Sequence, residues 1–301
     1  MKVSVIILNY NCEEYIKECL QSVFDNTYKD IEIIVVDNCS TDNSLDKIKG
    51  YGNKITLITN NIISGTAQTF NQGIFKAKGE YILFLVSDTR LDPNCIAKLV
   101  EALDNDSSIG ISSAKMLYMD NHQQIDSVGE YINQYGFLEP RHKGHELEPE
   151  LFNTRTEIFS CRGNSMMLRA SLGLSFDENF YIMVEETDLC WRCWKRGYSV
   201  VFVPDAVIYH KVSHSLSKNN RLVKYYGARN YVKMLNKNLT FFEKIRVLPI
   251  HILLWFLLSF RTNNGKALRA GLWDLFFGQT VFKRFKHKTS LWKLYKKTRG
   301  Y

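Results

Sequence analysis

The sequence lacks the glycine-rich motifs with which many enzymes bind nucleotides. No G-x-G-x-x-G follows the first predicted strand, and no G-x-x-x-x-G-K-[ST] occurs in the 301 residues. A dinucleotide-dependent dehydrogenase and a P-loop enzyme are therefore excluded. The zinc-protease motif H-E-x-x-H is missing as well, because His210 and His214 are four residues apart but no Glu follows His210.

Cysteine is scarce for a chain of this length. The seven cysteines are an odd number spread thinly, and Cys190-x-x-Cys193 has no second pair at the spacing of a zinc site. No charged segment followed by an apolar one stands at Met1. We therefore expect reduced thiols, no structural zinc and a cytoplasmic protein.

The composition also lacks the biases of unfolded and fibrous chains. Hydrophobic residues make up 45% of the sequence and charged residues 23%, a balance that allows a buried core. Intrinsic disorder, collagen and a disulfide-rich miniprotein are excluded. The length fits one large domain or two, at about 150 residues per domain.

Acidic residues are nearly missing from the last third of the chain. Residues 211–301 hold 20 Lys and Arg but only Glu243 and Asp274, whereas residues 1–210 hold 19 basic and 29 acidic residues. A basic segment attached to an acidic body indicates binding to a polyanion, either nucleic acid or an anionic membrane surface. No nucleic-acid-binding motif accompanies the charge, which favours the membrane.

The same region has no hydrophobic run long enough to span a membrane. Residues 247–260 are uncharged, but Pro249 and His251 interrupt them, and a spanning helix needs about 20 apolar residues. Apolar helices that contain Trp, next to the basic clusters 283–288 and 293–299, are typical of a protein bound to the membrane surface. The alternative is a helical domain that packs on the acidic body or forms a homodimer.

The first hundred residues alternate between strand and helix patterns. Nearly continuous apolar runs predict buried strands at 3–8, 31–36, 54–59 and 81–86. Helically spaced apolar residues follow Asn11, which stands as an N-cap with Glu14 three residues on, and another helix is predicted over 65–77. This order predicts an α/β fold with a doubly wound, mostly parallel sheet.

Polar residues follow three of the predicted strands. These strands end in Leu8-Asn9-Tyr10-Asn11, Asp37-Asn38 and Ser87-Asp88-Thr89. Ligands bind at the carboxyl ends of the strands in a parallel sheet, so Asp37 and Asp88 are expected to converge on one crevice. The alternative is that each Asp only caps a turn.

Several segments form a specific pattern when they are taken in order. They are Val3–Asn11, Val35–Asp42, Ala77–Asp88, Phe176–Phe180 with Glu185–Arg192, Val203–His210 and Tyr225–Asn230. Together they resemble the family 2 glycosyltransferases of the GT-A fold, and in particular the rhamnosyltransferase-like branch. The resemblance extends from Val3 to about Asn230.

The resemblance implies a GT-A catalytic domain over residues 1–210 and a basic, aromatic-rich helical region over 211–301. Within the catalytic domain, residues 1–115 would bind a nucleotide-sugar and residues 116–210 an acceptor. It further implies an inverting enzyme that moves one sugar from a dTDP-rhamnose-like or UDP-linked donor to a lipid-linked or polysaccharide acceptor in cell-surface glycan synthesis. We expect this enzyme at the inner face of the cell membrane.

The resemblance also implies the residues of the donor site. The nucleotide-sugar would contact Leu8, Tyr10, Asp37, Asn71 and Asp88. Asp88 and His210 would hold Mg²⁺ or Mn²⁺, which stabilises the negative charge that grows on the leaving diphosphate. The sequence departs from the family here, because Val86-Ser87-Asp88 lacks the first polar residue of the usual Asp-x-Asp motif.

Inversion requires a carboxylate that takes the proton of the acceptor hydroxyl. The resemblance assigns this role to Glu186, where the family usually has Asp, and Glu185 and Asp188 are alternatives. These acids also fit the first turn of a helix, where negative charge is favoured. The turn Arg162-Gly163-Asn164 is implied to lie on the acceptor side.

Two other functions remain open from the sequence. One is a non-catalytic member of the family that binds a sugar or forms a scaffold. The other is a sugar-1-phosphate nucleotidyltransferase, although such an enzyme needs a glycine-rich basic loop after the first strand and this chain has Asn9-Tyr10-Asn11-Cys12 there.

Overall fold

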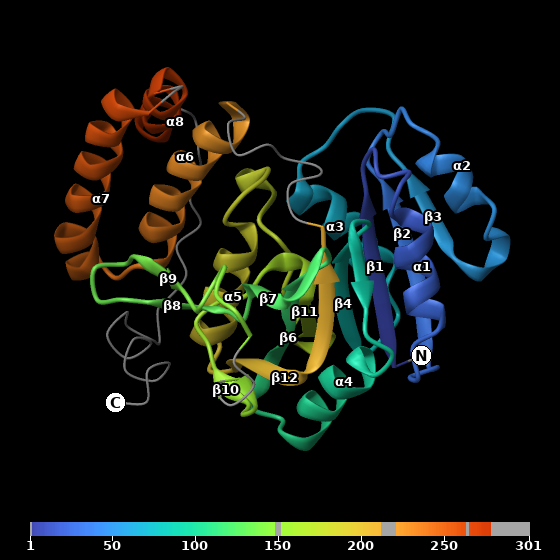
Figure 1. Cartoon of the computed structure of the whole chain (residues 1–301). Helices are drawn as coiled ribbons and strands as arrows, with labels where there is room; N and C mark the ends of the chain where they lie inside the picture. The colour runs from blue at the N-terminus through green and yellow to red at the C-terminus, as the bar shows by residue number, and fades with distance from the viewer. Residues whose placement is uncertain (1, 148–151, 212–220, 263–264, 278–301) are drawn as a thin grey trace.

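The computed structural model describes residues 2–147, 152–211, 221–262 and 265–277. A ten-stranded sheet forms the centre of the molecule (Figure 1). Its strands are β1 (Val3–Asn9), β2 (Ile31–Asp37), β3 (Thr56–Thr59), β4 (Tyr81–Val86), β5 (Thr89–Leu91), β6 (Ile109–Tyr118), β7 (Asn121–Ser127), β10 (Thr156–Glu157), β11 (Met166–Arg169) and β12 (Ser199–His210). A separate hairpin consists of β8 (Glu130–Ile132) and β9 (Leu138–Pro140).

The α-helices flank this sheet and extend beyond one edge of it (Figure 1). They are α1 (Ile16–Phe24), α2 (Ser44–Lys49), α3 (Thr66–Lys76), α4 (Cys95–Asn105), α5 (Glu185–Lys195), α6 (Arg221–Asn238), α7 (Phe241–Arg261) and α8 (Gly265–Phe277). Short 3₁₀ turns add to them, among which Gly163–Ser165 and Glu178–Phe180 lie close to the candidate site.

The first four strands form a parallel unit. β1 pairs in parallel with both β2 and β4, and β3 pairs in parallel with β2. The observed strands agree with the predicted strands to within two residues at each end, and the helix predicted over 65–77 is α3. The predicted α/β fold is confirmed.

The sheet continues with strands that the sequence patterns did not predict. β11 is antiparallel to both β4 and β6, and β12 lies parallel to β6. The end of β12 also pairs with β5, so that His210 is opposite Thr89. This pairing places His210 beside the end of β4, although the two are far apart in the sequence.

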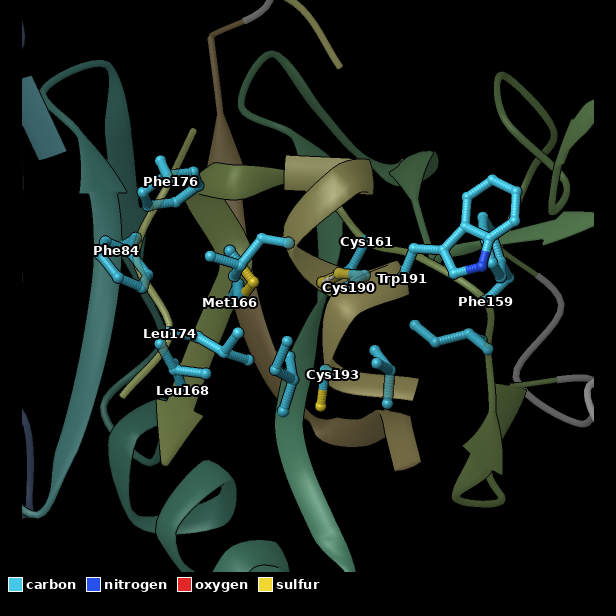
Figure 2. Close-up of a cluster of buried hydrophobic side chains, with 14 of the residues drawn as sticks. Phe84, Phe159, Cys161, Met166, Leu168, Leu174, Phe176, Cys190, Trp191 and Cys193 are labelled. Carbon is cyan, nitrogen blue, oxygen red and sulfur yellow. Dashed lines mark hydrogen bonds between the residues drawn. The ribbon is translucent and has the colours of Figure 1, made fainter. Parts of the chain in front are cut away.

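Two hydrophobic cores lie on opposite faces of the sheet because successive side chains of a strand point to opposite sides. In β1, Ile6 packs in the core that includes α3 and α5, whereas Val5 and Ile7 pack in the core that includes α1 and α4. Figure 2 shows the first core around α5, where Trp191 lies edge-on against Phe159. All seven cysteines are free thiols.

The predicted N-cap at Asn11 is wrong. Helix α1 begins at Ile16, and its N-cap position is Tyr15. Asn11 instead has a φ of 45°, which Asn tolerates better than most residues. Its side-chain oxygen accepts a hydrogen bond from the backbone N–H of Thr41 at 2.7 Å. Asn11 therefore connects the loop after β1 to the loop after β2.

Helices α6, α7 and α8 pack against one another beyond the sheet (Figure 1). The uncharged run 247–260 lies within α7, and Pro249 lies inside that helix. Among the described helices, none combines the length and the apolar character needed to cross a membrane. His214 and the basic clusters 283–288 and 293–299 lie outside the described residues.

Candidate functional site

The ends of β1 and β2 are joined by a network of buried polar groups. Asn9 and Asp37 are register partners, and the amide of Asn9 donates to Oδ1 of Asp37 at 2.7 Å. The backbone N–H of Ser40 donates to Oδ2 of Asp37 at 3.0 Å. Both carboxylate oxygens of Asp37 thus accept bonds from the chain and hold the loop after β2. A contact of Asp37 with a nucleotide stays a prediction.

A small pocket opens where β1 and β4 end. It is lined by Leu8, Tyr10, Asn11, Cys12, Val86, Ser87 and Asp88. Three of the five residues predicted to bind the nucleotide-sugar therefore lie together here. A pocket at the carboxyl ends of neighbouring parallel strands is the usual ligand site of such a sheet.

Asn71, another predicted donor residue, does not line this pocket. Its side-chain amide donates to the carbonyl of Phe176 and to the carboxylate of Glu178, both at 2.9 Å. Its side-chain oxygen accepts from the N–H of Phe176 at 2.9 Å. In this structure Asn71 fastens α3 to the segment before α5, and its contact with the donor stays a prediction.

Asp88 and His210 meet as predicted, and a third residue joins them. Nε2 of His210 is 3.7 Å from Oδ1 of Asp88, and Nδ1 of His210 is 2.8 Å from Oδ2 of Asp126. Burial raises the pKa of Asp126, but the hydrogen bond to His210 and the nearby positive charges together outweigh this effect, so the pKa of Asp126 is below its ordinary value. Within the described residues, no group of three or more His, Cys, Asp and Glu side chains is placed to hold a metal.

Glu185 and Glu186 begin helix α5; Glu185 is buried, whereas Glu186 is half-buried. Burial, together with the nearby Glu186, raises the pKa of Glu185 well above its ordinary value. Burial also raises the pKa of Glu186, although Arg162 opposes this change. Oε2 of each residue is buried without a hydrogen-bond partner in the structure. Such a carboxylate has the free lone pair and the raised proton affinity that a general base needs.

The turn predicted to lie on the acceptor side faces Glu186. A Cβ added to Gly163 would be only 3.5 Å from Cβ of Glu186. Burial disfavours the charge of Arg162, but Glu130 and Glu186 outweigh it and raise the pKa of Arg162. The structure thus brings Arg162 and Gly163 to the carboxylate predicted to be the base.

The backbone just before α5 is strained. Tyr181, Met183 and Val184 have φ values of 58°, 73° and 74°, a region that residues other than Gly seldom occupy, Val least of all. Asn230 of α6 holds this segment, because its side-chain amide lies 2.5–3.0 Å from three carbonyl oxygens of residues 180–183. Strain that is maintained by such contacts often marks a functional site.

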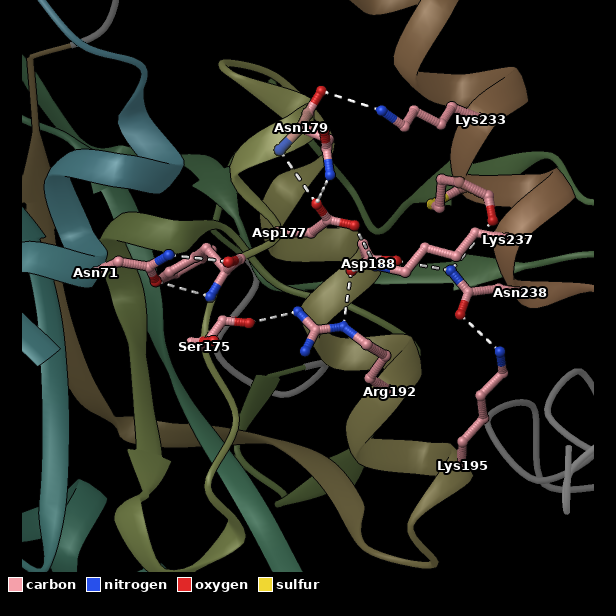
Figure 3. Close-up of polar contacts among 12 residues, drawn as sticks. Asn71, Ser175, Asp177, Asn179, Asp188, Arg192, Lys195, Lys233, Lys237 and Asn238 are labelled. Atoms are coloured by element: carbon pink, nitrogen blue, oxygen red, sulfur yellow. Dashed lines mark hydrogen bonds and ion pairs between the residues drawn. The ribbon is translucent and has the colours of Figure 1, made fainter. Parts of the chain in front are cut away.

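Asp188 lies in the interface between α5 and α6 (Figure 3). Its side chain is 0% exposed. Oδ2 accepts bonds from Arg192 at 2.7 Å and Lys237 at 2.8 Å, and Oδ1 accepts one from Asn238 at 2.8 Å. A carboxylate saturated by three donors and closed to water cannot reach an acceptor hydroxyl. These contacts favour Glu186 over Asp188, and the identity of the base stays a prediction.

Two residues of this region have contacts that the sequence does not specify. Asp126 lies in a segment that suggests contacts with an acceptor or a donor without fixing them, and Asn230 stands at the end of one of the family segments. No spacing rule links Asp126 to His210, 84 residues away, or Asn230 to Phe180, 50 residues away. Neither residue stands out in its own element, because β7 and α6 hold several other polar residues.

Comparison with known proteins agrees with this fold. Residues 4–173 match the family described as glycosyl transferase family 2. A poly(ribitol-phosphate) beta-glucosyltransferase of Bacillus spizizenii is 38% identical over 238 residues, which are 72% of this chain and 36% of that protein. The chain thus spans about a third of the length of that relative.

Solved structures with lower identity share the architecture. Residues 1–349 of TarS from Staphylococcus aureus, in complex with UDP-GlcNAc, align with a TM-score of 0.62 at 20% identity and cover 91% of this chain and 80% of that one. The mannosyltransferase PcManGT from Pyrobaculum calidifontis, in complex with GDP-Man and Mn²⁺, aligns with a TM-score of 0.58 at 16% identity and covers 93% and 76%. The GT-A fold is shared, and the family match covers more than half of the chain. The protein belongs to glycosyltransferase family 2 and is a glycosyltransferase.

Proposed function

We propose that this enzyme transfers one sugar, with inversion, from a nucleotide-sugar to a hydroxyl of a lipid-linked or polysaccharide acceptor. The observation that carries the proposal is the environment of Glu186. Its carboxylate has a raised pKa and lies against the turn Arg162-Gly163.

Glu186 would act as the general base. The acceptor oxygen attacks the anomeric carbon while the bond from that carbon to the diphosphate oxygen breaks, and the diphosphate leaves with the electron pair. The proton of the acceptor hydroxyl passes to Oε2 of Glu186, which makes no hydrogen bond in the described structure. Burial raises the pKa of Glu186, and the positive charge of Arg162 opposes this rise, so the nearby guanidinium favours the ionised form that acts as a base.

A divalent cation would fit between Asp88 and His210, next to the leaving diphosphate. Asp88 and His210 provide one carboxylate oxygen and one imidazole nitrogen, 3.7 Å apart, and both are ligands of Mn²⁺ and related ions. When bound, the cation would neutralise charge on the leaving diphosphate. Since two ligands come from the described residues, the diphosphate and water would fill the remaining coordination positions of the cation.

The donor is proposed to carry a pyrimidine nucleotide. The names of the similar proteins support UDP-linked glucose or N-acetylglucosamine, whereas the rhamnosyltransferase-like segments support dTDP-rhamnose. A thermal-shift panel of UDP-, dTDP- and GDP-sugars with and without Mn²⁺ distinguishes them, because a bound ligand stabilises the folded state by mass action. If no nucleotide-sugar raises Tm, the donor proposal fails.

The reaction is tested by product analysis. We expect release of a nucleoside diphosphate and a product whose anomeric configuration, measured by NMR, is opposite to that of the donor. Release of pyrophosphate would indicate a nucleotidyltransferase instead. Binding of a nucleotide-sugar without release or transfer, across lipid-linked and polysaccharide acceptors, would favour a non-catalytic sugar-binding protein.

The acceptor is proposed to be reached at a membrane surface through α7. Large apolar side chains of this helix face solvent, including Phe241 at 70%, Phe242 at 81% and Phe260 at 65% exposure. A groove of about 590 Å³ between α7 and α8 is lined by apolar residues and one cation, Arg269. An apolar face of this size with basic residues around it fits the interface of an anionic bilayer. A homodimer through the same face is the alternative, and sedimentation with and without vesicles distinguishes the two.

A further inference from the structure

We propose that Asp126 positions His210 as a ligand of the divalent cation. The proposal rests on the proposed function, because it concerns the cation expected beside Asp88. Asp126 lies on β7, and His210 ends β12; both strands pair with β6. The two side chains therefore meet across β6, and the same sheet fixes both of them.

The hydrogen bond between the two residues defines the protonation of the imidazole. An ionised carboxylate can only accept, so the 2.8 Å contact with Oδ2 of Asp126 places the proton on Nδ1 of His210. In the neutral ring, Nε2 then has a lone pair. Nε2 faces Asp88 across 3.7 Å, a distance longer than an N–H···O hydrogen bond. The lone pair of Nε2 and the carboxylate of Asp88 are thus directed to the same space.

Burial makes this arrangement rigid. Asp126 is only 3% exposed, and its other oxygen, Oδ1, lies 3.4 Å from Nζ of Lys143. One oxygen is therefore engaged by His210 and the other by a cation that balances the buried charge. A carboxylate bound to the far nitrogen of a histidine fixes the ring and makes the near nitrogen a stronger donor to a metal.

The sequence shows why the cation site would need a more basic nitrogen ligand. Val86 stands where the family usually has the first acid of its metal motif, so the site has one carboxylate fewer. A histidine whose basicity is raised by Asp126 compensates for part of that loss. The competing explanation is that Asp88, His210 and Asp126 only form a structural ion-pair chain around a protonated imidazole, which would bind no metal.

The experiment is a titration of the full-length protein with MnCl₂, in which free Mn²⁺ is measured by electron paramagnetic resonance, alone and with UDP. Asp126→Asn keeps the size of the side chain but removes its charge and its strict acceptor character. We expect the Kd for Mn²⁺ to rise about 10- to 100-fold. Asp126→Glu, which restores a carboxylate, should recover part of the affinity, and His210→Ala should lose at least as much as Asp126→Asn.

Asp120→Asn is the matched control. Asp120 lies in the turn between β6 and β7, is largely exposed and pairs with Lys211 at 2.6 Å, so the same chemical change there should leave the Kd for Mn²⁺ unchanged. The proposal is overturned if Asp126→Asn binds Mn²⁺ within twofold of the unaltered protein, even when its Tm falls. It is also overturned if the unaltered protein binds no Mn²⁺ with or without UDP. Tight Mn²⁺ binding without sugar transfer would instead contradict the proposed function and leave this inference standing.

Discussion

From β1 to β4, the polar residues of the site lie at strand ends and meet their neighbours through the register of the sheet, as Asn9 meets Asp37. From β6 to α6, they meet across long stretches of chain, as Asp126 meets His210 and Asn230 meets residues 180–183. We call these the N-terminal unit and the C-terminal unit. The N-terminal unit offers a pocket. The C-terminal unit offers the proposed base, Glu186, with the strained segment that precedes it, and the histidine His210. The reaction needs both, so each unit can be disabled separately.

The largest effect is expected where the two units share a site. Asp88→Ala removes the contribution of the N-terminal unit to the cation site and should lower turnover by at least about 10³-fold, because several kcal/mol of charge stabilisation are lost. The stabilisation that Mn²⁺ adds to nucleotide binding in a thermal-shift assay should also disappear. Asp46→Ala, an exposed Asp on α2, is the control. Normal turnover and an unchanged response to Mn²⁺ would show that Asp88 only caps a turn.

The next effect isolates the C-terminal unit. Glu186→Gln keeps the shape of the side chain but cannot accept a proton, so kcat should fall about 10²- to 10⁴-fold while the KM for the donor stays nearly constant. In the unaltered enzyme, activity should fall as the pH drops through a pKa that is higher than that of an ordinary Glu, since the base must be ionised. Steady-state kinetics over a pH series measures both quantities.

Glu185→Gln is the isosteric control for this assignment. Burial and the nearby Glu186 raise the pKa of Glu185 well above its ordinary value, whereas Arg162 opposes the rise at Glu186. Glu185 is therefore the less readily ionised of the two, and Gln resembles a protonated Glu. Turnover of Glu185→Gln should therefore stay within a few-fold of normal. If Glu185→Gln loses activity and Glu186→Gln keeps it, the roles of the two residues are reversed.

The ion pairs between α5 and α6 should matter for stability rather than for chemistry. Asp188→Asn leaves Arg192 and Lys237 without their shared carboxylate (Figure 3). Breaking a buried ion pair from one side should lower the free energy of unfolding by on the order of 3 kcal/mol. Denaturant titration measures this loss, and kcat per folded molecule should remain. A stable variant without activity would restore Asp188 as the base.

A smaller stability effect follows from the pKa of Glu185. In the unfolded chain Glu185 ionises near its ordinary pKa, whereas burial raises its pKa in the folded state. Folding therefore takes up a proton at pH values between these two pKa values, and the unaltered protein loses stability as the pH rises from the unfolded pKa toward the folded one. Glu185→Gln should match the unaltered protein near pH ~4.5 and exceed it increasingly at higher pH. Equal Tm values over the whole series would contradict the burial of Glu185.

These predictions also show what the sequence can and cannot specify. The strands of the N-terminal unit and the place of Asp88 followed from apolar runs and from the geometry of parallel sheets. Glu186 and the turn Arg162-Gly163 came from resemblance, and the structure brings them together. The contacts of Asn71 and Asp188 within the fold could not be predicted, because a polar residue in a family segment serves either a ligand or the fold, and only the packing of α3 and α6 around it shows these contacts.

The last and smallest effect concerns the apolar face of α7, for which the N-terminal unit supplies an internal control. Phe242 on α7 and Phe75 on α3 are 81% and 85% exposed, so Phe242→Ser and Phe75→Ser remove equal side chains from solvent. If α7 enters a bilayer interface, Phe242→Ser should weaken binding to phosphatidylglycerol vesicles about tenfold, the effect of burying much of one Phe side chain, and Phe75→Ser should leave it unchanged. Vesicle co-sedimentation over a salt series measures both. Salt should weaken the contribution of the basic residues but not that of Phe242. Equal binding of the two variants, or no binding by the unaltered protein at any ionic strength, would leave the homodimer as the explanation for this face.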